Sequence, residues 1–172
     1  MRIIGGRLRG KKLFFVCDEK TRPTPDRVKE NVFNILCARG FDFTRARVLD
    51  FFAGTGQMGV ECFSRGATDI TFNDTRRECV DIITKNCTAV GLRPKIAQPT
   101  GQYDLIFLDP PFAVTDGVQN AINELETGDH IAKNAIIVAE TETPDLDFGA
   151  GMAVDKRKYG RETIYILSNT LN

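Results

Sequence analysis

The chain has 172 residues, of which 42% are hydrophobic and 27% are charged, as expected for a soluble globular protein of one domain. This composition excludes disordered, collagenous and coiled-coil chains, and the apolar runs are too short to span a bilayer. The net charge is zero, but residues 1–47 carry +7 and residues 48–172 carry −7. A basic segment ahead of an acidic body fits either an anionic partner, such as nucleic acid, or a solvated basic face.

No apolar signal segment follows Met1, so we expect a cytoplasmic protein that does not contact a membrane. The five cysteines are odd in number and lack Cys-x-x-Cys spacing, and His130 is the single histidine. These counts predict reduced, partly buried thiols rather than a disulfide framework, and they predict no metal site.

The N-terminal quarter contains turn and helix signals in sequence. Residues 2–16 predict two short strands around a glycine-rich, basic turn, and residues 21–25 predict an extended linker because each proline disfavours helix before it. Thr24 is suited to cap the following helix, with Pro25 as its first residue. Apolar residues at helical spacing then predict an amphipathic helix over 26–38, followed by a loop to about residue 45.

From residue 47 the pattern alternates between strand and helix. Strands are expected at 48–52, 70–72, 95–97, 105–108, 135–139 and 163–167, and helices at about 57–65, 76–90 and 116–126. Continuous apolar strands alternating with helices predict a parallel, doubly wound sheet covered on both faces. The fold class is therefore α/β, with one domain over 1–172: a hairpin and linker at 1–25, a helix and loop at 26–46, and a Rossmann-like core at 47–172.

A glycine-rich loop with the spacing Gly54-x-Gly56-x-x-Gly59 joins the first core strand to its helix. This is the dinucleotide fingerprint, and Asp74 at the end of the next strand can accept both hydroxyls of a ribose. The pattern predicts a nucleoside-containing cofactor. The expected cofactor-binding residues are Asp50, Phe52, Ala53, Gly54, Thr55, Gly56, Asp74 and Thr24.

Asp50 favours S-adenosylmethionine over NAD as that cofactor. The carboxylate lies at the end of the strand, four residues before Gly54. It could hold the ammonium of S-adenosylmethionine, directly or through water, whereas it would face the pyrophosphate of NAD unfavourably. An NAD-dependent oxidoreductase stays an alternative, but it leaves the next motif unexplained.

The second motif, Asp109-Pro110-Pro111-Phe112, follows the strongest strand of the chain. In a sheet of order 3-2-1-4-5 this turn lies beside the glycine loop, at the topological switch point. Asp109 and the Pro110 carbonyl can accept both N–H bonds of an exocyclic amine, which frees its lone pair for a methyl sulfonium. The prolines stiffen the turn, and Phe112 can stack on the base, a contact worth ~1–3 kcal/mol. We therefore assign Asp109, Pro110, Pro111 and Phe112 as catalytic.

The basic residues of the N-terminal hairpin are candidates to bind the phosphates of a nucleic acid. They are Arg2, Arg7, Arg9, Lys11, Lys12 and, in the linker, Arg22. Two other polar sites are expected to be structural only: Glu140 as a solvated strand end, and residues 156–159 as a polar hairpin tip.

Several motifs resemble the RsmD family of bacterial small-subunit ribosomal RNA guanine-N2 methyltransferases. They are Arg2-Ile3-Ile4-Gly5-Gly6, Thr21-Arg22-Pro23-Thr24-x-Asp26-Arg27-Val28, Asp50-x-Phe52-Ala53-Gly54-Thr55-Gly56, Asp109-Pro110-Pro111-Phe112 and Lys158-Tyr159-Gly160. The resemblance runs from residue 2 to about 167. It implies a class I methyltransferase fold, S-adenosylmethionine as cofactor, and a guanine of 16S rRNA in an assembling small subunit as substrate. It also implies that Asp109 and Phe112 hold the target base. We expect a monomer.

The sequence departs from this family between the third strand and the Asp-Pro-Pro strand. Members carry a longer segment with an Asp or Asn-Ala step that binds adenine, whereas here only residues 98–102 intervene, without an acid. To reach the Asp-Pro-Pro strand, the chain must cross three strand spacings of about 4.8 Å and also return along the length of a strand. That path exceeds the ~17 Å that five extended residues can span. Either the strand at 95–97 is absent or displaced, or the natural chain carries further residues here, which we favour; the encoding gene tests this.

The leading prediction is methyl transfer from S-adenosylmethionine to guanine N2 in 16S rRNA. One alternative is a DNA adenine-N6 methyltransferase, although no target-recognition domain is visible. Another is a catalytically impaired RNA-binding or assembly protein of the same fold, which the shortened segment at 98–102 favours.

Overall fold

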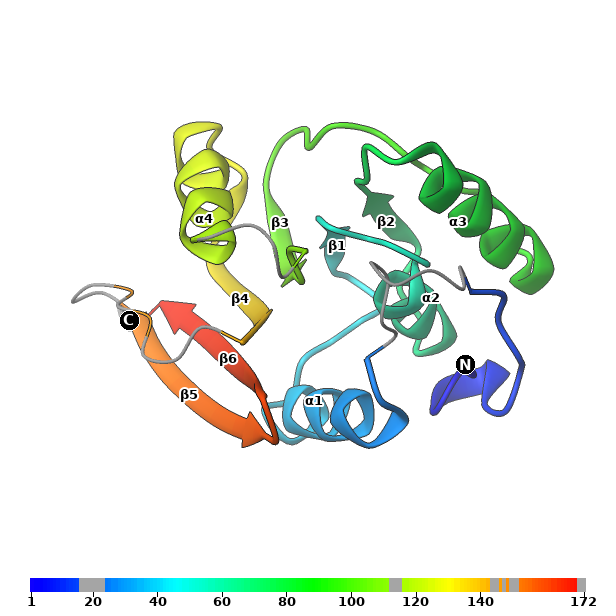
Figure 1. Cartoon of the computed structure of the whole chain (residues 1–172), viewed down its shortest axis with the longest axis horizontal. Helices are drawn as coiled ribbons and strands as arrows, with labels where there is room; N and C mark the ends of the chain where they lie inside the picture. Colours follow the sequence, from blue (N-terminus) through cyan, green and yellow to red (C-terminus); the bar gives the residue numbers. More distant parts are fainter. Residues whose placement is uncertain (16–23, 112–115, 143–145, 147, 149–151, 170–172) are drawn as a thin grey trace.

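The computed structural model describes residues 1–15, 24–111, 116–142, 146, 148 and 152–169, and it centres on one six-stranded sheet of order β2-β1-β3-β4-β6-β5 (Figure 1). The strands are β1 (Arg47–Asp50), β2 (Asp69–Phe72), β3 (Tyr103–Leu108), β4 (Ile131–Thr141), β5 (Met152–Tyr159) and β6 (Glu162–Asn169). The α-helices in these ranges are α1 (Asp26–Ala38), α2 (Gln57–Ser64), α3 (Arg77–Val90) and α4 (Gly117–Thr127). No helix in the described ranges has the length and apolarity needed to cross a bilayer.

Two apolar clusters cover the two faces of the sheet, as the alternating pattern predicts. One cluster joins residues of α1, α2 and α3 to one face, and the other joins residues of α4 to the opposite face. Close packing of α2 against β2 depends on Gly59, because a Cβ there would lie 2.3 Å from the Phe72 ring. The third glycine of the fingerprint therefore lets the helix approach the strand.

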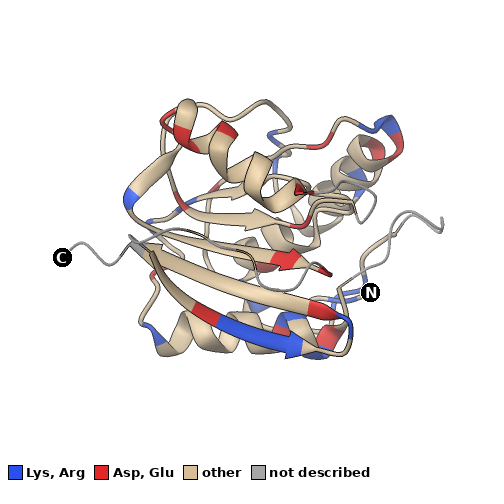
Figure 2. Cartoon of the chain, turned by 60° about the vertical axis from the view of Figure 1, so that its left-hand side comes forward, with Lys and Arg blue, Asp and Glu red and all other residues tan. Residues whose placement is uncertain are grey.

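The sheet is parallel from β2 to β4 but ends in an antiparallel hairpin, which corrects the all-parallel expectation. β6 pairs antiparallel with both β4 and β5. Residues 156–159 lie in β5, so the prediction of a hairpin tip is wrong; the turn comes after them, at Gly160. β5 escapes sequence analysis because it is an edge strand whose side chains are mostly exposed and which contains a run of charged residues over 155–158. These charges, coloured in Figure 2, also protect the edge from further pairing.

The N-terminal segment folds back on itself but forms no regular strands in its described part. An isolated antiparallel bridge joins Arg2 to Lys12, and a 3-10 turn spans Gly6–Leu8. The helix at 26–38 is confirmed at both ends, but its start is not capped as expected. Pro25 occupies the cap position without a side-chain bond, and the Thr24 hydroxyl instead donates to Glu140.

The expected strand at 95–97 is present only as one parallel bridge between Ile96 and Phe72 of β2. No helix follows it, and the chain passes directly to Tyr103 at the start of β3. Seven residue steps from Ile96 to Tyr103 reach at most about 24 Å. A diagonal across three strand spacings needs only about 19 Å. The short connection is therefore long enough to cross the sheet diagonally. Its length no longer indicates that the natural chain carries further residues here, and only the gene sequence tests their presence.

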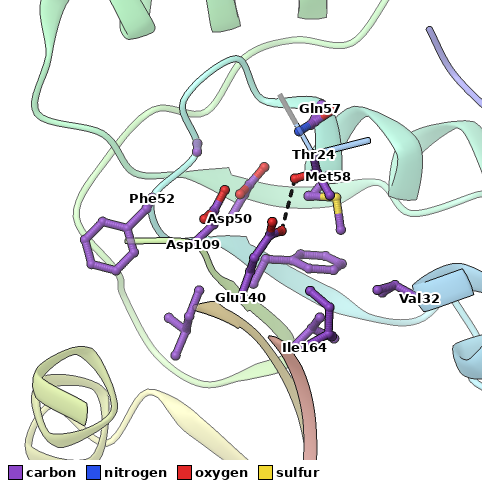
Figure 3. A pocket seen from close by; sticks show the side chains of 13 residues that line it. Thr24, Val32, Asp50, Phe52, Gln57, Met58, Asp109, Glu140 and Ile164 are labelled. Atoms are coloured by element: carbon purple, nitrogen blue, oxygen red, sulfur yellow. Dashed lines mark hydrogen bonds between the residues drawn. The ribbon is translucent and has the colours of Figure 1, made fainter. Parts of the chain in front are cut away.

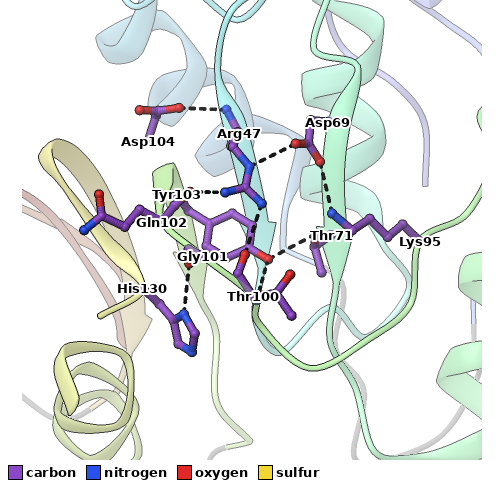
Figure 4. Close-up of polar contacts among 10 residues, drawn as sticks. All are labelled: Arg47, Asp69, Thr71, Lys95, Thr100, Gly101, Gln102, Tyr103, Asp104 and His130. Carbon is purple, nitrogen blue, oxygen red and sulfur yellow. Dashed lines mark hydrogen bonds and ion pairs between the residues drawn. The ribbon is translucent and has the colours of Figure 1, made fainter. Parts of the chain in front are cut away.

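Arg47 fastens this connection to the sheet (Figure 4). Its guanidinium donates to the carbonyls of Thr100 and Gln102 at 3.0 and 2.8 Å, and to the Asp69 carboxylate at 2.9 Å. The same group lies over the Tyr103 ring, 4.9 Å from its centroid. Tyr103 in turn donates its hydroxyl to Thr71 of β2 at 3.2 Å. The Arg47 guanidinium therefore holds β1 to β2, to the short connection and to the start of β3.

We expect Arg47→Ala to lower the free energy of unfolding by about 2 kcal/mol, because two carbonyls and a carboxylate lose their donor together. Arg47→Lys should recover less than half of this, since an ammonium cannot reproduce the planar fork. Urea unfolding measures both. The control is Arg45→Ala, whose side chain is 89% exposed and pairs only with Asp42. An Arg47→Ala protein as stable as that control would contradict this role.

Candidate active site

Three carboxylates converge where neighbouring parallel strands end. Asp50 is the last residue of β1, Asp109 follows β3, and Glu140 lies near the end of β4. Because Leu108 pairs in register with Ala139, Asp109 and Glu140 lie side by side one step further along. Figure 3 shows the three side chains grouped in one pocket.

Asp50 is 4% exposed and accepts a hydrogen bond from the Gly59 N–H, in the first turns of α2, at 3.0 Å. Burial raises the pKa of this carboxyl to about 7, and the charge of Asp74 adds to the rise, although the Gly59 bond opposes both. Apart from the Gly59 hydrogen bond, this buried carboxyl keeps lone pairs that can bind a cation.

Glu140 is also buried, with 8% of its surface exposed, so its assignment as a solvated strand end is wrong. The Thr24 hydroxyl donates to its Oε2 at 3.1 Å, across 116 residues of sequence. Burial and then the nearby charge of Glu162 raise the pKa of Glu140 to about 7, while the bond from Thr24 lowers it. The sequence signal for this residue was its position, directly after the apolar strand beside the Asp-Pro-Pro turn.

Asp109 is half-buried and lies among acidic neighbours. Burial, followed by the charges of Glu140, Asp50 and Glu162, raises its pKa well above the usual aspartate range. Pro110 is buried behind it, and Pro111 is exposed. Phe112, the last residue of the motif, lies outside the described residues.

The glycine loop closes beside this cluster. Gly54 donates its N–H to Asp74 at 2.9 Å, and Arg76 donates its backbone N–H to the other oxygen of the same carboxylate. Gly56 adopts φ +73°, in the left-handed region, and α2 begins at the next residue. The loop, the start of α2 and the ribose-type carboxylate are therefore brought together, as the fingerprint predicts.

The pocket contains only part of the predicted site. Its lining residues are Thr24, Val32, Asp50, Phe52, Ala53, Gln57, Met58, Phe107, Leu108, Asp109, Val138, Glu140 and Ile164. Four predicted cofactor residues do not line it: Gly54, Thr55, Gly56 and Asp74. The Thr55 carbonyl accepts a bond from the Asn86 amide at 2.8 Å. Arg22 lies outside the described residues. The described residues form no group of three or more His, Cys, Asp or Glu that could hold a metal ion.

Gln57 is a further pocket residue that sequence analysis missed. Its side chain is 7% exposed, and its Oε1 is the one buried side-chain oxygen in the described chain without a hydrogen-bond donor. An orphaned acceptor beside three carboxylates indicates a ligand rich in N–H, O–H or cationic groups. No sequence pattern marks it, because a glutamine at the first position of a helix is ordinary.

The basic N-terminal segment, residues 1–15, is anchored to the helices that flank the glycine loop. Glu61 of α2 accepts the N–H groups of Ile4 and Gly5 at 2.9 and 2.8 Å. Asn86 of α3 accepts the Phe14 N–H, and donates to the Phe14 carbonyl as well as to the glycine loop. The segment is thus held at fixed positions on the core.

Its predicted RNA-binding side chains differ in their surroundings. Arg2 pairs with Asp26 at 2.9 Å, Arg7 lies over the Phe63 ring, and the Lys11 ammonium donates to the Ala89 carbonyl. Arg9 and Lys12 are exposed and make no ion pair with the described residues. Of these five cations only Arg2 is paired with a described carboxylate, so four positive charges remain for an anionic partner.

Comparison with known proteins gives the family. The model of the family described as conserved hypothetical protein 95 matches residues 1–168. The chain belongs to this family, the RsmD family. It is 36% identical over 156 residues to ribosomal RNA small subunit methyltransferase D of Haemophilus influenzae, covering 83% of this chain and 79% of that protein. The Escherichia coli K12 protein of the same name is 34% identical over 152 residues, covering 83% and 75%.

The solved structure of the Escherichia coli protein yhhF has the same fold. It superposes with a TM-score of 0.86 at 28% identity, and the match covers 100% of this chain and 99% of that one. The expected class I methyltransferase fold is therefore confirmed, with the antiparallel hairpin β5–β6 as part of it. The family resemblance seen in the sequence motifs is confirmed as well.

Glu140→Gln should change how the stability of this RsmD-family protein depends on pH. Because the folded-state pKa of Glu140 is raised to about 7, the folded chain binds this proton more tightly, and stability falls as the pH rises from about 4.5 to 7. A glutamine removes that loss. Relative to the unsubstituted protein, the variant should gain roughly 1–3 kcal/mol between pH 5 and pH 8 in urea unfolding. Glu124→Gln on an exposed face of α4 is the control; an equal, pH-independent effect of both variants would contradict the burial account.

Proposed function

We propose that the protein transfers a methyl group from S-adenosylmethionine to the exocyclic N2 of a guanine in 16S rRNA. The observation that carries this is the convergence of Asp109, in an Asp-Pro-Pro turn, with Asp50 and the glycine loop at the carboxyl edge of one sheet. The relatives named ribosomal RNA small subunit methyltransferase D support the RNA substrate class. Guanine, and N2 as the acceptor atom, are what the RsmD resemblance implies, whereas the chemistry below requires only an exocyclic amine.

The residues present fit this cofactor. Asp50 and the orphaned Gln57 Oε1 are acceptors in a pocket whose described lining has no Lys or Arg, and they suit an ammonium group. Asp74, bonded to the loop amide of Gly54, still has lone pairs for ribose hydroxyls. When bound, S-adenosylmethionine supplies a methyl group on a positively charged sulfur. Its charge would also lower the raised pKa values of the carboxyls around it.

Asp109 would activate the target amine. The lone pair of a purine amine is delocalised into the ring, so the nitrogen is a poor nucleophile. The Asp109 carboxylate and the Pro110 carbonyl would each accept one N–H bond and hold the amine so that its lone pair faces the methyl group. After transfer the methylated nitrogen carries a positive charge and loses a proton readily, so a strong base is unnecessary.

The N-terminal segment would bind the phosphates of the RNA. Arg9 and Lys12 are exposed, and Phe14 and Phe15, exposed by 55% and 50%, add aromatic faces on which unpaired bases can stack. We place the substrate rRNA in an assembling small subunit in the cytoplasm, and the enzyme acts as a monomer.

One incubation distinguishes this function from its alternatives. The protein is supplied with labelled S-adenosylmethionine and either small subunits from a bacterium lacking its own relative, or DNA. We expect label in 16S rRNA, recovered as N2-methylguanosine by mass spectrometry of nucleosides. N6-methyladenosine in DNA would support the DNA-directed alternative, and RNA binding without label would support an inactive assembly protein. Stabilisation by NAD but not by S-adenosylmethionine would support an oxidoreductase.

Asp109→Ala should reduce turnover far more than cofactor affinity. The carboxylate acts on the amine in the transition state, so its loss should lower kcat by about 10²–10⁴-fold. The Kd for S-adenosylmethionine should change less than about fivefold, because Asp50 and the glycine loop remain. Single-turnover kinetics and calorimetry measure the two quantities. Equal losses in both would show that Asp109 serves the cofactor instead.

Replacing Arg7, Arg9, Lys11 and Lys12 by alanine should weaken RNA binding and flatten its dependence on salt. Each lost phosphate contact lowers the slope of log K against log salt by about 0.7–0.9, so two to four contacts reduce it by roughly two to four units. Cofactor affinity should persist, because the segment is anchored by its backbone to Glu61 and Asn86. RNA binding is measured from 50 to 300 mM salt. If the variant keeps the original slope, another surface binds the RNA phosphates.

A further inference from the structure

Glu140 is buried in the pocket, yet the transfer reaction described above gives it no task. We propose that Glu140 selects guanine as the target base by accepting the hydrogen bond from its N1–H. This inference rests on the proposed function, since it assigns a specificity-determining residue to the same site.

The position of Glu140 follows from the sheet. Leu108 pairs with Ala139, so the next residues, Asp109 and Glu140, project side by side at the ends of adjacent parallel strands. Both line the pocket, with Phe107 and Val138 as its apolar floor. A base whose amine is held by Asp109 would therefore present the neighbouring atoms of the same edge to Glu140.

The Glu140 carboxylate is held in place and has a free acceptor. Thr24 donates its hydroxyl to Oε2 at 3.1 Å, while the other oxygen makes no hydrogen bond with the described residues. The titratable groups near it are Asp109 and Glu162, both acidic. No described residue that lines the pocket is basic. Glu140 therefore has one oxygen free to accept a hydrogen bond from a ligand.

The two purines with exocyclic amines differ at the atom beside the amine. In guanine the ring nitrogen N1 carries a proton next to the 2-amine, so the edge offers two adjacent donors. In adenine N1 is an acceptor next to the 6-amine, and a carboxylate facing it would meet a lone pair. A flipped base is read through hydrogen bonds along this edge, and a buried site that lacks its partner rejects the wrong base strongly. Two neighbouring carboxylates thus match guanine and mismatch adenine.

The test uses 2-aminopurine, which keeps the 2-amine of guanine but has no proton on N1. After the methylated nucleotide has been mapped by mass spectrometry, small subunits are assembled with guanine or 2-aminopurine at that position. We expect the unsubstituted enzyme to prefer guanine in kcat/KM by about 10²-fold. Glu140→Gln should narrow the preference to less than about tenfold, because an amide can accept from N1–H or donate to a bare N1.

Two variants separate selection from general damage. Glu162→Gln removes a neighbouring buried carboxylate that does not line the pocket, and it should keep the 10²-fold preference. Thr24→Val removes the hydroxyl that orients Glu140 and should narrow the preference partly. Affinity for S-adenosylmethionine should stay within about fivefold of the original in Glu140→Gln.

The outcomes are distinct. A preference unchanged in Glu140→Gln, or a loss confined to cofactor affinity, would overturn the inference while leaving guanine methylation intact. Failure of the unsubstituted enzyme to methylate guanine at N2 in any small subunit would overturn the proposed function, and this inference with it.

Discussion

The structure depends on a concentration of acidic side chains at one edge of a parallel sheet, two of them buried and one half-buried. Asp50, Asp109 and Glu140 end or follow three neighbouring strands, and the described residues that line their pocket include no Lys or Arg. Taking a carboxylate out of water without a neighbouring cation is costly, and the raised pKa values of all three carboxyls reflect this cost. The burial and the acidic neighbours of these carboxyls favour their protonated forms, whereas a cationic cofactor and an N–H-bearing base would favour the charged forms.

The surrounding elements can be understood as supports for this edge. The Gly59 amide in α2 donates a hydrogen bond to Asp50 and so offsets part of the cost of burying that carboxyl. Thr24, just before α1, donates its hydroxyl to Glu140 and fixes its position. Asn86 of α3 binds Phe14 of the basic segment and Thr55 of the glycine loop with one side chain. A single buried amide, that of Asn86, therefore joins the surface proposed to bind RNA to the loop proposed to bind the cofactor. A displacement of either one should shift the other.

Features with a local cause were predictable from the sequence. The helix α1 matches its predicted bounds because its apolar spacing is regular, and the glycine loop and the Asp-Pro-Pro turn lie together because parallel strands share a carboxyl edge. Features that depend on distant partners were not. The strand β5 has no apolar alternation, Thr24 bonds a residue 116 positions away instead of capping its helix, and Glu140 is buried by strands from later in the chain. The short connection before β3 differs from the expectation because it takes a diagonal path, which Arg47 fastens through contacts between residues about 55 positions apart.

Proton release on cofactor binding tests the central claim, that unneutralised carboxylates create the demand for a cationic ligand. Titration calorimetry with S-adenosylmethionine at pH 7, repeated in buffers of different ionisation enthalpy, gives the number of protons exchanged. With the pKa of Asp50 raised to about 7 in the free protein, a bound cation should expel about half a proton from it per complex, and Asp50→Asn should abolish that share. Binding of S-adenosylmethionine with no proton release, or with the same release in Asp50→Asn, would contradict the account.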